Sequence, residues 1–556
     1  MKNRTRIVLP QKLDNFWLIA GLLAILLATS MTRDITRPFY GLHSWGEAHG
    51  PWNARTHIKY GLGYTKGLLT KAVGDPPIEK PLRYLNHPQL PSLLNVPFMA
   101  LFGFHEWSLR IVNTASTLLV LLLFLKILRG LLDDKTALLA GLIFCLFPLI
   151  GYFGANGWLY PFGLWAIWNY LVIINGLRAG PEPKKLHRVC LAISLFMAIQ
   201  MGWEGFFFDM AIGLHYVFHC LRRYIKQKEL PDMRLLAILL IIPAASILTN
   251  FTVMAAGYGW DWERIFITYK WRAGSGEMPQ HDWGQWFARM WEFGVTNFTL
   301  PVIIIAVLYL TIGRLFVFME PQGTQGHRRR QFPQFWLFFM IPVFQQFVLK
   351  GCLWKHQTWE RPFSFIIAMA AALGIVFIWD VLKKRSEYLA KIVIALLLGV
   401  IFLYCVIGTN YYYDIRWQPP SKIRMFKMLN EKIPPSKRLL SFEDFIVNQG
   451  DRAKIPFYRP EVAWYLDREV VPAKTLSEIE EQSKTGKYPY YLMPLANHNG
   501  KVSAYLAQLS DQLRKQYQYE YIAGEPGEVT KDGKFLKAGM FPYMIFDLTS
   551  RIDGTD

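Results

Sequence analysis

Long apolar runs separated by short polar segments fill the first 410 residues of the chain. Several runs reach the roughly 20 residues that an α-helix needs to cross a bilayer. We therefore expect a polytopic α-helical membrane protein. The runs predict about eleven transmembrane helices, at residues 15–32, 109–129, 136–154, 158–177, 189–203, 205–221, 235–256, 298–318, 333–350, 362–382 and 389–408.

Lysine and arginine residues alternate along these runs in a way that predicts orientation. They are absent from the short turns at 155–157 and 203–205. They cluster instead at 126–135, 178–188, 222–234, 328–330 and 383–385. Cytoplasmic loops carry the excess of basic residues, so the N-terminus is expected in the cytoplasm. An odd number of spans then puts the C-terminus on the opposite face.

One apolar stretch, residues 89–104, does not fit this scheme. Pro91 and Pro97 interrupt it, and it is short for a full crossing. Counting it as a span would put every later basic loop outside the cytoplasm. We therefore expect a juxtamembrane or re-entrant helix that is buried against protein.

From about residue 411 the pattern changes to short elements typical of a soluble domain. Helices are expected at 421–432, 461–469 and 503–516, and strands at 438–442, 488–494 and 541–548. Alternating strands and helices favour a small α/β fold. The predicted organisation is a transmembrane catalytic domain over 1–410, with a first external loop at 33–108, and an extracytoplasmic α/β domain over 411–556.

Composition supports a membrane protein and argues against a nucleic-acid partner. The chain has 52% hydrophobic and 18% charged residues, where soluble domains average about 25% charged residues. The net charge of +20 is explained by basic cytoplasmic loops. No basic stripe with interleaved aromatic residues is present.

The first external loop holds most of the residues that could support chemistry. Glu47 lies among several histidines and is followed by Arg55 and Lys59. A carboxylate in this setting can act as a general base toward a hydroxyl group, and the cations can bind a phosphate. The alternative is a solvated loop with a few interfacial anchors, and composition alone does not separate the two.

Several ordered motifs resemble a known family. HSWGEA and ARTHIKYG are followed by NHPQLPSLL, which contains His87, and then by FGFHEWSLR, which contains Glu106 and Arg110. Over about residues 16–130 this order is similar to the protein O-mannosyltransferase-like and aminoarabinose-transferase-like glycosyltransferases of the GT-C superfamily. The span count and the soluble tail are similar as well.

The resemblance implies an inverting transfer of a sugar from a polyprenyl-phosphate donor. The acceptor would be a hydroxyl group of a protein, lipid or glycan on the non-cytoplasmic face. The catalytic acid of the family lies in the first loop, often as the Asp of an Asp-Glu pair. Here the pair reads Gly46-Glu47, so Glu47 is expected to be the base, with His49 as the second candidate.

Further residues are expected to bind substrate. Glu204 is a carboxylate at a span boundary, where ionisable residues often mark function, although a solvated turn residue explains it equally well. Lys355, His356 and Arg361 lie in one external turn and can clamp a phosphate, although interfacial anchoring also suits the two cations. The full set of substrate-binding candidates is Arg55, Lys59, His87, Arg110, Glu204, Lys270, Arg272, Lys355, His356 and Arg361.

Cofactor and partner expectations follow from the same residues. The first loop has no DxD motif, so no cofactor is expected and a divalent metal is not favoured. The expected partners are the lipid-linked sugar donor, membrane lipids and an unidentified acceptor, in a bacterial inner membrane. The alternatives are a transporter or channel for a lipid or an anion, which would show inverted repeats not found here, and an inactive glycan-assembly subunit.

Overall fold

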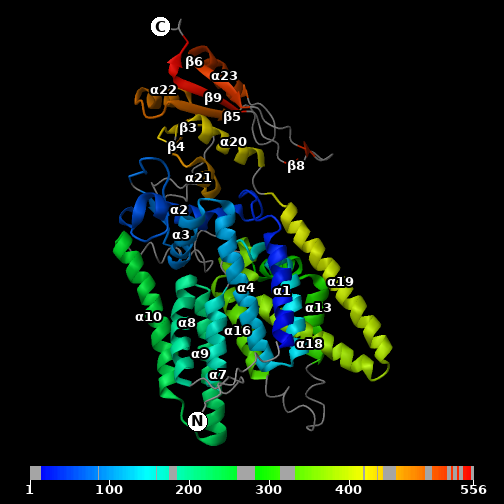
Figure 1. Ribbon diagram of the computed structural model, residues 1–556. Helices are drawn as coiled ribbons and strands as arrows, with labels where there is room; N and C mark the ends of the chain where they lie inside the picture. The colour runs from blue at the N-terminus through cyan, green and yellow to red at the C-terminus, as the bar shows by residue number, and fades with distance from the viewer. Residues whose placement is uncertain are drawn as a thin grey trace, which may run out of the picture.

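A computed structural model describes residues 14–79, 81–85, 87–157, 160–174, 184–259, 282–313, 332–416, 420–434, 436–442, 459–494, 504–522, 528–529, 535–537 and 543–552. Within these ranges the molecule has three layers (Figure 1). A helical bundle lies at one end and a β-sheet at the other. The helices α2 (Ser44–Thr65) and α3 (Leu90–Phe102), both from the first loop, lie between them.

The bundle contains helices at all of the predicted apolar runs. They are α1 (Asn15–Thr32), α4 (Glu106–Leu131), α5 (Asp134–Leu146), α6 (Pro148–Phe153), α7 (Pro161–Ile173), α8 (Lys184–Met201), α9 (Gly205–Gln227), α10 (Met233–Tyr258), α12 (Trp283–Phe298), α13 (Leu300–Leu308), η1 (Tyr309–Gly313), α16 (Phe332–Val348), α17 (Lys350–Lys355), η2 (Gln357–Glu360), α18 (Phe363–Lys383) and α19 (Glu387–Asp414).

Five of the described helices are long and apolar enough to cross a membrane, or six if the bent pair α12 and α13 forms one span. The five are α1, α4, α10, α18 and α19. The chain is therefore an integral membrane protein. The count of eleven crossings stays a prediction, because helices such as α7 are shorter than a straight span requires.

The predicted helix at 136–154 is broken near its end. Pro148 separates α5 from α6, and Phe147 before it has an extended backbone with ψ of 127°. Proline offers no backbone N–H and disfavours the helical conformation of the preceding residue. The break positions the turn after α6, which carries Asn156 toward α4 and α7.

The stretch 89–104 forms α3, which packs on α2 and α4. Its residues are divided between a buried and an exposed face. Ser92, Asn95 and Met99 are buried, whereas Phe98 and Leu101 are exposed. One face therefore packs against protein, as expected, and an apolar face points outward, as in a helix that lies along a membrane surface. The juxtamembrane or re-entrant placement stays a prediction.

The tail, residues 411–556, contains a five-stranded mixed sheet. Its order is β4-β3-β5-β9-β6, with β3 parallel to β4 and β5, and β9 antiparallel to β5 and β6. The elements of the sheet and its helices are β3 (Leu439–Ser441), β4 (Val470–Pro472), β5 (Tyr490–Pro494), β6 (Tyr517–Ile522), β9 (Tyr543–Arg551), α20 (Pro420–Lys432), α21 (Pro460–Leu466), α22 (Leu476–Lys484) and α23 (Ala504–Gln516). A separate pair in the tail joins β7 (Glu528–Val529) to β8 (Phe535–Lys537), and a pair in the first loop joins β1 (Thr70–Lys71) to β2 (Leu82–Arg83).

The tail and the first loop share one hydrophobic core. Phe39, Trp52 and Met99 of the first loop belong to the same buried cluster as Phe426 and Trp464 of the tail. Figure 1 shows α21 directly above α2 and α3. The tail is therefore packed onto the layer that covers the bundle.

Candidate active site

A cavity of about 230 Å³ lies where α2 and α3 cover the ends of the bundle helices. Its lining comes from α2, α3, α4, α7 and α8 and from the turns beside them. One water molecule occupies about 30 Å³ in the liquid, so the cavity is large enough for a ligand. Four of the predicted residues line it: His49, His87, Glu204 and Arg361.

Several polar groups of the lining have unused hydrogen-bonding capacity. Within the described structure, five buried polar atoms of the lining make no hydrogen bond: His49 Nε2, Ser92 Oγ, Asn95 Oδ1, Asn113 Oδ1 and Asn156 Nδ2. A buried polar group without a partner costs about 1–3 kcal/mol. A ligand with several hydroxyl groups would supply both donors and acceptors here, so the lining is suited to a sugar.

Arg361 supplies positive charge to the cavity. It follows η2, and its Nε donates to the Thr358 carbonyl at 3.0 Å. The guanidinium lies against Gly157, where a Cβ would be 3.1 Å from Nη2. Glycine therefore leaves room for the guanidinium beside the cavity. A guanidinium offers paired N–H groups that fit a phosphate.

Glu204 supplies the only carboxylate among the described residues that line the cavity. It lies in the turn between α8 and α9. A Cβ at Gly205 would be 2.1 Å from the Ala198 carbonyl oxygen, and one at Gly202 would be 2.5 Å from Glu204 Oε2. The two glycines therefore allow α8 and α9 to approach closely and the carboxylate to fold over the turn. Within the described part of the chain, this carboxylate has no hydrogen bond and no ion pair.

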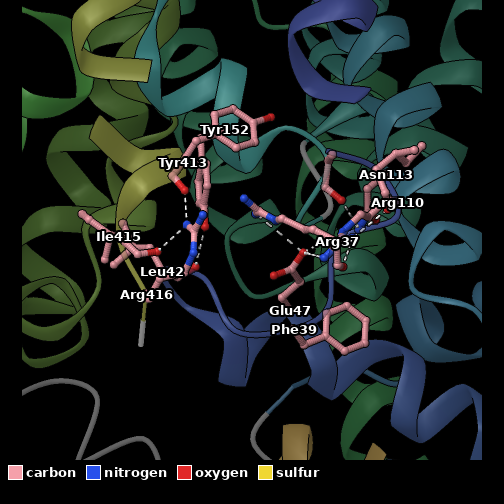
Figure 2. Close-up of polar contacts among 12 residues, drawn as sticks. Arg37, Phe39, Leu42, Glu47, Arg110, Asn113, Tyr152, Tyr413, Ile415 and Arg416 are labelled. Atoms are coloured by element: carbon pink, nitrogen blue, oxygen red, sulfur yellow. Dashed lines mark hydrogen bonds and ion pairs between the residues drawn. The ribbon is translucent and has the colours of Figure 1, made fainter. Parts of the chain in front are cut away.

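Glu47 is held in a buried ion pair outside the lining (Figure 2). Arg110 Nε donates to Glu47 Oε1 at 2.7 Å, and Arg37 Nη2 lies 3.9 Å from the same oxygen. Arg110 also donates to the backbone carbonyls of Ile35 and Arg37. These contacts tie the start of the first loop to α4. The geometry gives Glu47 and Arg110 a positioning role next to Gly46, which does line the cavity.

Arg55 and Lys59 bind the tail rather than the cavity. Arg55 donates to the carbonyls of Ala463 and Trp464 at 2.6 Å each, and its guanidinium lies 4.8 Å from the Trp464 ring. Lys59 Nζ lies 2.9 Å from Asp467. Cations stabilise the carbonyl end of a helix. The two residues expected to bind substrate therefore fasten the end of α21 to α2.

His49 has the character of a neutral imidazole. Its ring stacks on Trp45 with centroids 5.3 Å apart and meets Tyr84 edge-on at 5.0 Å. Burial, together with the nearby charge of Lys71, lowers the pKa of His49 well below its usual value. His49 is therefore uncharged at neutral pH and offers the cavity a hydrogen-bonding nitrogen rather than a cation.

The other predicted residues are dispersed. His87 lines the cavity, with its ring 5.7 Å from that of Tyr84. Lys355 ends α17 as an exposed residue and His356 follows it, and neither belongs to the lining. Lys270 and Arg272 lie outside the described residues.

Prediction from sequence missed the uncharged polar residues. Ser92, Asn95, Asn113 and Asn156 were not candidates, although they contribute four of the five buried polar atoms that make no hydrogen bond in the described lining. A signal was present for Asn113, because it is an amide inside a predicted membrane span. Polar residues within apolar spans are costly unless they have a function.

Comparison with known proteins agrees with the fold. The model of the family described as dolichyl-phosphate-mannose-protein mannosyltransferase matches residues 86–247. No curated protein sequence matches the chain significantly.

Solved structures cover nearly the whole chain at low identity. ArnT from Cupriavidus metallidurans bound to undecaprenyl phosphate has a TM-score of 0.56 at 12% identity, over 97% of this chain and 99% of that one. The archaeal oligosaccharyltransferase AglB from Archaeoglobus fulgidus, in complex with an inhibitory peptide and a dolichol-phosphate, has a TM-score of 0.53 at 11% identity, over 94% and 74%. The chain therefore shares its fold with these two proteins.

Proposed function

We propose that the chain is an integral-membrane glycosyltransferase. It would transfer a sugar from a polyprenyl-phosphate donor to an acceptor hydroxyl on the non-cytoplasmic face, with inversion. The observation that carries the proposal is the cavity beneath α2 and α3, which Arg361 lines and where five buried polar atoms make no hydrogen bond within the described structure. The fold shared with ArnT and AglB supports the same class of reaction.

The surface of α3 suits a lipid-linked donor. Ser92 and Asn95 face the cavity, while Phe98 and Leu101 on the same helix are exposed. A donor with its isoprenoid chain in the membrane can therefore bring its head group to the polar side of this helix. Arg361 would bind the phosphate and stabilise the charge that develops on it as the sugar leaves.

Within the described ranges, no group of three His, Cys, Asp or Glu side chains is placed to hold a metal ion. The acceptor, whether protein, lipid or glycan, is left to experiment. A transporter and an inactive assembly subunit are the competing functions.

Transfer is tested with the full chain in lipid nanodiscs and radiolabelled polyprenyl-phosphate sugars, using peptide, lipid and glycan acceptors. We expect labelled acceptor, and we expect Arg361→Met to raise the KM for the donor about 10- to 100-fold, since a charged hydrogen bond contributes about 1.5–3 kcal/mol. Arg385→Met, at an exposed residue after α18, is the control. Anion or lipid flux in liposomes without any transfer would identify a transporter instead.

A further inference from the structure

Transfer to a hydroxyl group requires a group that accepts the hydroxyl proton. We infer that Glu204, in the turn between α8 and α9, is the catalytic base of this chain. The inference rests on the proposed function and assigns its proton acceptor. Glu204 is the only acidic residue among the described residues that line the cavity, and it reaches the cavity from the bundle rather than from the first loop.

Glu47 is poorly placed for this role. Its Oε1 accepts from Arg110 and faces Arg37, and the residue is only 2% exposed and outside the lining. A reaction at this oxygen would have to break the ion pair with Arg110. Removing it would leave Arg110 buried without its charge partner, so Glu47 acts by positioning the loop.

His49 is in the lining but is a weaker candidate than Glu204. Its Nε2 is buried and makes no hydrogen bond within the described structure. The burial and the Lys71 charge that keep it neutral oppose formation of the imidazolium that proton transfer would create. Glu204 is half-buried, and its carboxylate meets no cation in the described structure. It can therefore accept a proton without breaking an ion pair.

The acceptor oxygen attacks the anomeric carbon of the donor sugar and forms a new C–O bond. The bond from that carbon to the phosphate oxygen breaks, and its electron pair leaves with the polyprenyl phosphate. The hydroxyl proton moves to the Glu204 carboxylate, which releases it to water after the products leave. Arg361 stabilises the phosphate charge formed at the same time.

The cavity offers a second position from which a carboxylate could replace Glu204. Gly46, in the first turn of α2, lines the same cavity, and a Cβ there would meet no atom within 4 Å. An Asp at this position is also favoured by the N-terminal end of the helix. A carboxylate at position 46 could replace a missing base, but it could not replace a structural contact of Glu204. Position 46 is therefore suited to a rescue experiment.

The test compares sugar transfer by the wild type, Glu204→Gln, Glu204→Asp and the double variant Gly46→Asp/Glu204→Gln. Loss of a general base costs about 10²- to 10⁴-fold in rate, so we expect Glu204→Gln to fall by at least 100-fold in kcat with little change in donor KM. We expect Glu204→Asp to keep part of the activity and the double variant to regain at least tenfold. Glu387→Gln, at an exposed surface ion pair on α19, is the control. Thermal unfolding of each variant establishes that it folds.

A second rescue uses Glu204→Ala with sodium formate, whose carboxylate can enter the space left by the truncated side chain. Activity lost in Glu204→Gln and restored by either carboxylate supports the assignment. Unchanged transfer in Glu204→Gln overturns it and leaves the proposed function intact. Loss that neither carboxylate restores also overturns it, because a positioning role would give that result. Absence of transfer by the wild type from every donor overturns the proposed function and this inference together.

Discussion

Burial changes the chemistry of single side chains in this protein, and Glu360 is the clearest case outside the cavity. It ends η2, is 2% exposed, and accepts from Asn297 Nδ2 at 2.8 Å. Tyr412 donates to the other end of the same amide at 2.6 Å. Burial raises the pKa of Glu360 to about 8 against the opposing effect of Asn297. At neutral pH this residue is therefore a neutral acid that links η2, α12 and α19.

A pH dependence of stability follows. The folded protein holds the Glu360 proton up to about pH 8, whereas the unfolded chain releases it near its ordinary pKa of 4.5. The stabilising contribution is complete below pH 4.5 and is lost as pH rises to about 8, by up to about 1.4 kcal/mol for each pH unit. We expect the midpoint of thermal unfolding to fall between pH 5 and 8 in the wild type and to fall less in Glu360→Gln.

Thermal unfolding in detergent from pH 5 to 9 measures this difference. The buried histidines titrate in both proteins, so their effect cancels when the two curves are subtracted. If the unfolding midpoints of the wild type and Glu360→Gln changed in parallel with pH, the proton on Glu360 would not contribute to the pH dependence of stability.

At the scale of elements, the tight turn between α8 and α9 requires a glycine at one position of its sequence. The tight turn at Trp203-Glu204-Gly205 was visible in the sequence, but the reason for its glycine was not. The structure gives that reason: the first residue of α9 passes so close to the Ala198 carbonyl that a Cβ would overlap it.

Two glycines of α9 give a matched pair of substitutions. Gly205→Ala would force α8 and α9 apart, and overpacking of this kind costs about 1–3 kcal/mol or more. Gly213→Ala adds a Cβ that meets no atom within 4 Å and gains about 0.5–1 kcal/mol of helix stability. We expect the unfolding midpoint to fall for Gly205→Ala, with loss of sugar transfer, and to rise or stay constant for Gly213→Ala. Equal effects of the two substitutions would contradict the close approach of the helices.

For the whole molecule, the main finding is that the tail and the first loop form one packed unit. Besides the shared core, Phe39 N donates to Tyr465 Oη at 2.8 Å, and that hydroxyl donates to Glu106 at 2.9 Å. Arg55 adds its contacts to the end of α21. The layer that covers the cavity is thus held from both sides, by α4 below and by the tail above.

Arg55 is expected to control how firmly the tail is attached. Arg55→Met leaves the Trp464 carbonyl at the end of α21 without its donor, at a cost of about 1–3 kcal/mol, whereas the Ala463 carbonyl still accepts from the backbone amide of Asp467. We expect amide hydrogen exchange in residues 460–466 to become about 10- to 100-fold faster. Lys515→Met, which breaks an exposed ion pair on α23, should leave exchange there unchanged, because such pairs contribute about 0–1 kcal/mol. No change with Arg55→Met would mean that the shared core alone fastens the tail.

The sequence predicted the helices well because apolar runs and turn residues are local signals. Each predicted element of the tail also forms where the pattern placed it. The site was harder, because a charge can have several partners. Arg55 and Lys59 are cationic residues like Arg361, but only the fold decides which of the three meets the cavity. Likewise, the ion pair of Glu47 joins residues 63 positions apart, and no local pattern reports such a contact.

The exposed apolar face of α3 has a consequence for how a lipid-linked substrate would arrive. One wall of the cavity is also part of the outer boundary of the protein, so a donor need not leave the bilayer to reach it. Diffusion would then be two-dimensional, and occupancy would follow the mole fraction of donor among the lipids rather than its bulk concentration. An affinity for such a donor has meaning only when it is expressed per unit of membrane.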